Sequence, residues 1–256
     1  MIRLLGIIIL STLVWSCYEP IEDCLDINAS NYNVNADNPC EDCCSFPTLR
    51  VDFSYPGIAT SLGDTLDLIN HRVVLHDFSF FLDDMYLVSF GEEIKYNRTI
   101  TIDGQEIEND FGFFNRSNFR RTFSDFVFSG ETDTLVFRLG LGNEISSINP
   151  DSLEVRVDFS NVPDSLFTDV GNYVDLGITL EDVATQEVFR IAIDPVVLEQ
   201  QAFRIPTPIE VDRGSGASLV VEVDFQLWLF DIDLTDMSAT ENAILSNLAN
   251  SFSVRE

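Results

Sequence analysis

The chain carries few residues that could perform nucleophilic chemistry. It has two histidines, five cysteines, and 43 acidic residues against 14 lysines and arginines. A serine hydrolase needs a histidine beside its nucleophile, and neither His71 nor His76 lies in a recognisable catalytic motif. Paired carboxylates such as Asp83-Asp84 occur in glycosidases, but so many acids make chance pairs expected. The sequence therefore predicts a protein that is not an enzyme.

Outside the cysteines, few side chains could bind a soft metal ion. Copper prefers imidazole, thiolate or thioether groups, and these are offered by His71, His76 and Met85. The two histidines form the candidate copper site. The alternative is that each histidine has a structural role. His71 and His76 have opposite parity, and such residues on a strand usually face opposite sides of the sheet, so they would not share a metal ion.

Two groups of side-chain oxygens have a spacing that calcium could use. They are Asp26, Asn28, Asn33, Asn35 and Asp37 near the amino terminus, and Asp231, Asp233 and Asp236 near the carboxyl terminus. Calcium takes hard oxygen ligands, but Asn and Asp also favour turns. Both a calcium site and a purely turn-forming role stay open for each group.

The charge limits the partners. A formal net charge of -29 opposes attraction to phosphate backbones, so nucleic acid is excluded as a partner. The same charge could attract cations or simply keep an exported protein soluble.

The amino terminus has the features of an export signal. Arg3 precedes an apolar run, Leu4–Val14, which is too short to span a bilayer. The sequence Val14-Trp15-Ser16-Cys17 then resembles a bacterial lipobox, with Trp15 in place of the usual small residue. We expect lipidation of Cys17, which would anchor the protein to a membrane of the cell envelope, with the outer membrane favoured. The alternative is an ordinary secretory signal.

The remaining cysteines are Cys24, Cys40, Cys43 and Cys44. Four cysteines close together in an exported chain predict two disulfides. A bond between the adjacent Cys43 and Cys44 would be strained. We therefore expect Cys24 to form a disulfide with Cys43 or Cys44, and Cys40 to form one with whichever of these two remains. The alternative is a zinc site of four thiolates.

After these cysteines, apolar and polar residues begin to alternate with a period of two, as they do along a β-strand. Leu49, Val51 and Phe53 alternate with polar residues, and the odd positions from Leu219 to Leu229 are all apolar. Further strands are predicted at 73–82, 94–102, 123–128, 134–141, 153–159, 173–180 and 187–193. One buried face and one wet face are typical of an antiparallel β-sandwich.

Only the carboxyl terminus has a helical pattern. Ser238-Ala-Thr-Glu241 is a capping-box sequence, and Ile244, Leu248 and Phe252 lie on one helical stripe. The sequence thus predicts an all-β chain in three parts. They are a signal peptide (1–16), a lipidated, disulfide-rich acidic segment (17–47), and a sandwich with a short C-terminal helix (48–256).

Six short segments carry a family resemblance. They are Leu49–Phe53, Leu62–Asp64, Val74–Leu87, Phe137–Gly142, Leu229–Asp233 and Ile244–Phe252. Their order resembles that of the MbnP-like family, named for a copper-binding periplasmic protein encoded with methanobactin. The resemblance implies a β-sandwich. For the founding members it also implies a copper site of His and an oxidised Trp made by a di-haem peroxidase partner.

This chain departs from the family's metal chemistry. The stretch 165–173 has no Trp, the only Trp after the signal is Trp228, and no His follows His76. The lipobox, the sandwich pattern and the absence of catalytic spacing predict a non-catalytic binding or structural domain of the MbnP-like type, whose partner is an unspecified protein or small ligand. Copper handling is the alternative, and glycan hydrolysis is the third reading.

Overall fold

The computed structural model describes residues 19–56, 64–94, 99–153, 174–193 and 202–255. The predicted signal peptide and Cys17 lie outside these residues, as does most of the strand predicted at 153–159. Within the described part, no helix is long and apolar enough to cross a membrane.

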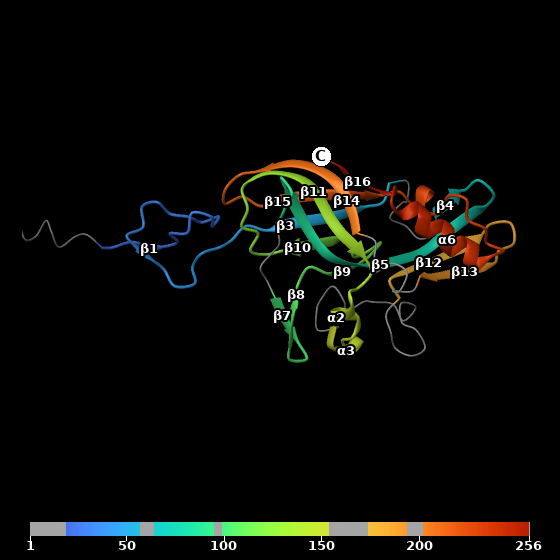
Figure 1. The fold of residues 1–256 in the computed structure, drawn as a ribbon, viewed down its shortest axis with the longest axis horizontal. Helices are drawn as coiled ribbons and strands as arrows, with labels where there is room; N and C mark the ends of the chain where they lie inside the picture. The colour runs from blue at the N-terminus through green and yellow to red at the C-terminus, as the bar shows by residue number, and fades with distance from the viewer. Residues whose placement is uncertain (1–18, 57–63, 95–98, 154–173, 194–201, 256) are drawn as a thin grey trace, which may run out of the picture.

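The main domain is a β-sandwich of a four-stranded and an eight-stranded sheet (Figure 1), as predicted. The smaller sheet has the order β10-β3-β15-β16. Its strands are β10 (Arg120–Phe123), β3 (Leu49–Ser54), β15 (Ala217–Val223) and β16 (Phe252–Arg255). The pair β3–β15 is parallel, whereas its neighbours pair antiparallel. This parallel pair joins strands from the two ends of the chain.

The larger sheet is organised by β5 (Arg72–Ser89), which spans 18 residues. The first half of β5 pairs with β12 and the second half with β11. The sheet order is β13-β12-β5-β11-β14, with three short strands also paired to β5. These strands are β4 (Asp64–Asp67), β6 (Glu92–Ile94), β9 (Gly112–Asn115), β11 (Gly130–Leu139), β12 (Leu176–Asp182), β13 (Val188–Ile193) and β14 (Ala202–Val211).

The other elements lie around this sandwich. They are β1 (Glu22–Asp23), β2 (Asn38–Pro39), β7 (Thr99–Ile102), β8 (Gln105–Glu108), α2 (Asn143–Ser146), α3 (Pro150–Leu153), α5 (Phe225–Trp228) and α6 (Met237–Leu248). Figure 1 shows the cysteine-rich segment with β1 at one end and α6 near the other, while the β7–β8 hairpin lies on the same side as α2 and α3.

Two apolar cores explain the strand patterns. The main core lies between the sheets, where the alternation of β3 buries Leu49, Val51 and Phe53. The smaller core contains Phe81, Ile107 and Ile145. Consecutive strand residues point to opposite faces. Because Phe80 belongs to the main core and Phe81 to the smaller one, both faces of β5 are covered here, and consecutive residues from Phe80 to Leu82 are apolar.

Three sequence predictions about single elements are wrong. The strand predicted through Leu229 ends at Val223, because the Asp224 side chain accepts hydrogen bonds from the N–H groups of Gln226 and Leu227 and caps α5. The stretch predicted as a strand at 123–128 contributes only its first residue to β10. Leu153 ends α3 and does not begin a strand.

The predicted C-terminal helix is present as α6. It begins two residues earlier than the capping-box pattern indicates, because the N-cap is Asp236, whose side chain accepts a hydrogen bond from Ala239 N–H, and not Ser238. Ile244 and Leu248 are buried as predicted. Phe252 lies beyond the helix, in β16, where its ring packs 5.2 Å from that of Phe137.

Candidate functional site

A cavity of about 230 Å³ opens beside the smaller core. Its charged lining consists of five acidic residues and one arginine. They are Asp83 and Asp84 of β5, Glu108 of β8, Asp110, Glu144 of α2 and Arg138 of β11. Ile107 and Ile145 supply an apolar wall. We call this cavity the carboxylate pocket.

An irregularity of β5 places two consecutive carboxylates in the pocket. The register against β11 shifts between Val136, which pairs with Tyr86, and Arg138, which pairs with Asp83. Thus β5 carries one extra residue, and Asp84 has a φ of +50°, as in a β-bulge. The main-core positions of β5 nearest the bulge are Phe78, Phe80 and Leu82 before it, and Met85 and Leu87 after it. The side chains that face the main core therefore switch from even to odd positions at Asp83-Asp84.

Asp83 is fixed at the inner part of the pocket. Its carboxylate accepts hydrogen bonds from Gly142 N–H at 2.6 Å and from Asp84 N–H at 2.9 Å. A Cβ at Gly142 would lie 2.5 Å from Asp83 Oδ2, so this close approach requires glycine. Burial raises the pKa of Asp83, although these two hydrogen bonds oppose the effect.

Among the acidic residues of the pocket, Asp110 has the most strongly raised pKa. Burial, followed by the negative charges of Asp83, Glu108 and Asp84, raises its pKa to about 7. Arg138 Nε lies 3.2 Å from Asp84 Oδ2, so the pocket's one basic side chain already has an anionic partner. The pocket therefore concentrates negative charge that its own arginine does not neutralise.

The two histidines have carboxylate partners on β12. His71 Nδ1 lies 3.1 Å from Asp182 Oδ2, and His76 Nε2 lies 2.7 Å from Glu181 Oε2. Met85, the third candidate copper ligand, is buried in the main core. Each imidazole thus lies within hydrogen-bonding distance of a carboxylate of β12.

The carboxyl-terminal calcium candidates shape the approach to α6. Asp231 has a φ of +57°. Asp233 Oδ1 accepts hydrogen bonds from the N–H and hydroxyl of Thr235, and these bonds lower the pKa of Asp233. Asp236 is the N-cap of the helix. The spacing of these acids is explained by a turn followed by a helix cap.

The amino-terminal calcium candidates also make turn contacts. Asp26 Oδ1 accepts a hydrogen bond from Asn28 N–H at 2.9 Å, and Asn33 Oδ1 accepts one from Asn35 N–H at 3.0 Å. The Asp37 carboxylate accepts one from Ile21 N–H. The contacts of Asp26 and Asn33 are the local side-chain turns that Asp and Asn favour, whereas the Asp37 contact joins two parts of the segment that are 16 residues apart.

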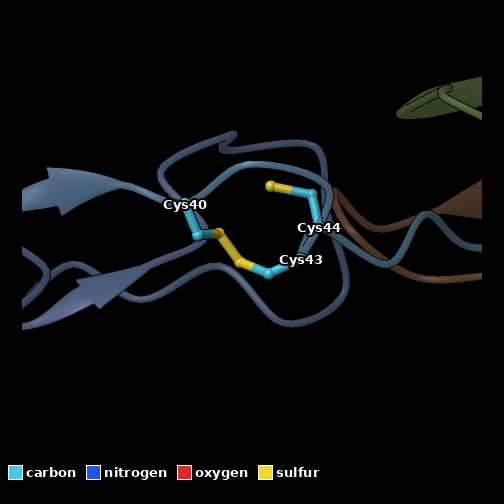
Figure 2. A group of neighbouring side chains, drawn as sticks. All are labelled: Cys40, Cys43 and Cys44. Atoms are coloured by element: carbon cyan, nitrogen blue, oxygen red, sulfur yellow. A yellow bond between two sulfur atoms is a disulfide. The ribbon is translucent and has the colours of Figure 1, made fainter.

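The cysteine-rich segment contains the disulfides Cys24–Cys44 and Cys40–Cys43, one of the two predicted pairings. Figure 2 shows the Cys40–Cys43 bond with the Cys44 side chain beside it. Among the residues that the structure describes, Cys40, Cys43 and Cys44 are the one group of three or more Cys, His, Asp or Glu side chains whose ligand atoms all lie within 4.8 Å of one another.

In the sequence, Asp83-Asp84 interrupts the apolar residues of β5, but apolar residues occur at even and odd positions on both sides of it. The bulge, a feature that often lies beside functional sites, is therefore visible only in the structure. Nothing in the sequence marks Asp110, because most of its environment comes from β5 and α2, which are distant in the chain, and only β8, which carries Glu108, is a neighbour in sequence.

No protein-family model matches the chain, and no curated protein matches it. Among solved structures, it is similar to MbnP from Methylosinus trichosporium, with 13% sequence identity and a TM-score of 0.44. The alignment covers 81% of this chain and 97% of that chain. A likeness this distant carries no argument about function, and the sandwich assignment rests on the strand pairings themselves.

Proposed function

We propose that this protein is a lipid-anchored, extracytoplasmic binding protein without catalytic activity, and that its carboxylate pocket binds a small organic cation. The observation that carries the proposal is the pocket itself, where five acidic residues and one arginine surround a cavity. A bound cation would offset the repulsion that keeps the pKa of Asp110 high.

The size and spacing of the pocket favour an amine or guanidinium over a bare metal ion. A cavity of about 230 Å³ greatly exceeds the roughly 10–15 Å³ that one water requires. In the described residues, no three acidic side chains bring their oxygens within 4.8 Å of one another, which a compact cation site would need. Ile107 and Ile145 offer apolar contact to the carbon atoms of an organic cation.

Binding of such a cation is expected to weaken as the pH falls. At pH 5.5, a carboxyl with a pKa of about 7 is almost fully protonated, so affinity for methylguanidinium should drop about 10- to 30-fold relative to pH 8. Isothermal titration calorimetry at both pH values measures this. The Asp110→Asn variant should bind weakly at both, with little pH dependence.

Asp212→Asn is the matched control, because Asp212 is exposed in the turn between β14 and β15. It removes the same charge from the protein without altering the pocket. Equal loss of binding in both variants would mean that net charge alone attracts the cation. Tight binding of Ca²⁺ with no response to methylguanidinium would also contradict the proposal.

The lipid anchor is proposed from the sequence Val14-Trp15-Ser16-Cys17. Two disulfides shortly after it support an oxidising, extracytoplasmic location. The six segments that resemble the MbnP-like family support a binding role. A lipid on Cys17 would hold the sandwich at the membrane surface.

The anchor predicts a clear difference in detergent partitioning. Expressed in a diderm bacterium, the wild-type protein should enter the detergent phase and have the mass of a cleaved, lipidated chain beginning at Cys17. The Cys17→Ser variant should stay in the aqueous phase, because it has no thiol to acylate. Aqueous partitioning of both proteins would show that the chain is not lipidated.

A further inference from the structure

The cysteine-rich segment brings the two disulfides together. Cys44 is bonded to Cys24, yet its sulfur lies within 4.8 Å of both sulfurs of the Cys40–Cys43 pair. In Figure 2 these three side chains extend toward one another from a single loop. Cys24 is fully buried, whereas the other three cysteines are partly exposed.

Hydrogen bonds also hold this loop. The Asn31 side chain donates to the carbonyl of Cys43 and accepts from Ser45 N–H, both at 2.8 Å. Asn33 N–H donates to the carbonyl of Cys24, and Cys40 N–H donates to that of Asp23. The backbone positions of Cys24, Cys40 and Cys43, and of Ser45 next to Cys44, therefore have supports that do not depend on sulfur–sulfur bonds.

The segment is also seated on the sandwich. Ala29 is buried, and Gly214, with a φ of +70°, packs so closely that a Cβ there would lie 3.0 Å from the Ala29 carbonyl oxygen. Reduction would therefore leave the segment attached to a folded domain, which limits how far the cysteines could separate.

We propose that reduction converts this segment into a binding site for a thiophilic metal ion such as Zn²⁺, held by Cys40, Cys43 and Cys44, with Cys24 as the fourth ligand. The site is independent of the carboxylate pocket and goes beyond the binding role proposed above. It would make the segment a redox-controlled metal site.

The chemistry is a thiol–disulfide exchange followed by metal binding. Each disulfide is reduced by one dithiol, which gives up two electrons and two protons and becomes a disulfide itself. Two dithiols thus yield four cysteine thiols. Coordination of Zn²⁺ by four thiolates then releases four protons to solvent.

The geometry suits this ion. Tetrahedral Zn²⁺ with bonds of about 2.3 Å to sulfur separates its ligands by about 3.8 Å, and the three sulfurs already lie within 4.8 Å of one another. Cys40-Glu41-Asp42-Cys43 has the two-residue spacing common in zinc sites. Asp23 Oδ1, 4.0 Å from Cys43 Sγ, adds negative charge beside the cation.

Cobalt spectroscopy on the full chain carrying Cys17→Ser tests the proposal, because the four cysteines are then the only thiols. After reduction by dithiothreitol and removal of the reductant under nitrogen, one equivalent of Co²⁺ should produce the absorption of a tetrahedral thiolate complex, and Zn²⁺ should abolish it. The oxidised protein should give no such absorption.

Two variants in this background locate the site. Cys43→Ser should weaken Co²⁺ binding about 100-fold, because a metal–sulfur bond is lost. Ser45→Ala changes an exposed hydroxyl next to Cys44 and should bind as the parent does. A reduced protein that has four titratable thiols and a folded circular dichroism spectrum, but no thiolate–cobalt absorption, would overturn the proposal.

Discussion

Replacing Phe80 by alanine is expected to lower the free energy of unfolding by about 3–5 kcal/mol. Phe80 is fully buried at the middle of β5. Its ring stacks on Phe114 at 5.6 Å and meets Phe53 and Trp228 edge-on, each at 5.8 Å. The change therefore opens a cavity between strands of both sheets and the helix α5. Urea denaturation at pH 7 measures the loss.

Phe90→Ala is the matched control, because Phe90 follows β5 in the same chain segment but is 84% exposed. Its effect should stay within about 0.5 kcal/mol. Similar losses for both variants would mean that the inward parity of β5 has been assigned wrongly. That error would also remove the basis for the bulge at Asp83-Asp84.

Asp110→Asn is expected to stabilise the protein at pH 8 and to leave its stability almost unchanged at pH 4. The pKa of Asp110 is raised from 3.8 to about 7 in the folded state. Between these values the folded state binds a proton that the unfolded chain does not. The stability associated with protonated Asp110 is therefore complete below pH 4 and lost as the pH rises toward 7.

Asparagine cannot ionise, so the variant keeps that stability. The gain at pH 8 should be about 1–4 kcal/mol, the upper value being the full linkage for this pKa difference. Chemical denaturation at pH 4, 6 and 8 measures it, with Asp212→Asn as a control whose effect should not vary with pH in this way. A constant difference between Asp110→Asn and wild type at all three pH values would contradict the electrostatic description of the pocket.

A gain in stability combined with a loss of cation binding would be informative about function. Carboxylates that repel one another are costly to a fold, and such costs are typical of binding sites. The same substitution would relieve the repulsion and remove the feature that attracts a cation.

Strands could be predicted from the sequence wherever one face of the strand is exposed to solvent, because apolar and polar residues then alternate. Leu49, Val51 and Phe53 alternate strictly with polar residues, and all three are buried in β3. After Val223 apolar residues continue to occupy every second position, which wrongly predicted a longer strand. Asp224 instead caps the helix α5. Leu227, predicted to face inward, is exposed, and Trp228 is buried instead.

The strand β14 was missed because it contains Pro206 and Pro208. Proline removes a backbone donor and is tolerated mainly on edge strands. The sheet order places β14 at one end of the eight-stranded sheet, which is where such a strand is allowed. A sequence with two prolines gives no local sign of which edge it will occupy.

The candidate sites also differ in whether they depend on neighbouring residues or on residues distant in the chain. Local features, such as the turn at Asp233 and the pairing options of the cysteines, follow from neighbouring residues and were open to prediction. The carboxylate pocket depends on the register of β5 against β11 and on the approach of β8 and α2. Those are long-range contacts, and from sequence Asp110 is simply one of 43 acidic residues.

Carboxyl ¹³C NMR of Asp110 tests the central claim most directly, because it reports both the pocket's electrostatics and its occupancy. In the free protein, the carboxyl carbon of Asp110 should titrate with a pKa of about 7. Saturating methylguanidinium should lower that pKa by about 1, since a nearby cation favours the ionised form. A carboxyl that titrates near 4 and does not respond to methylguanidinium would contradict the proposal that this pocket binds organic cations.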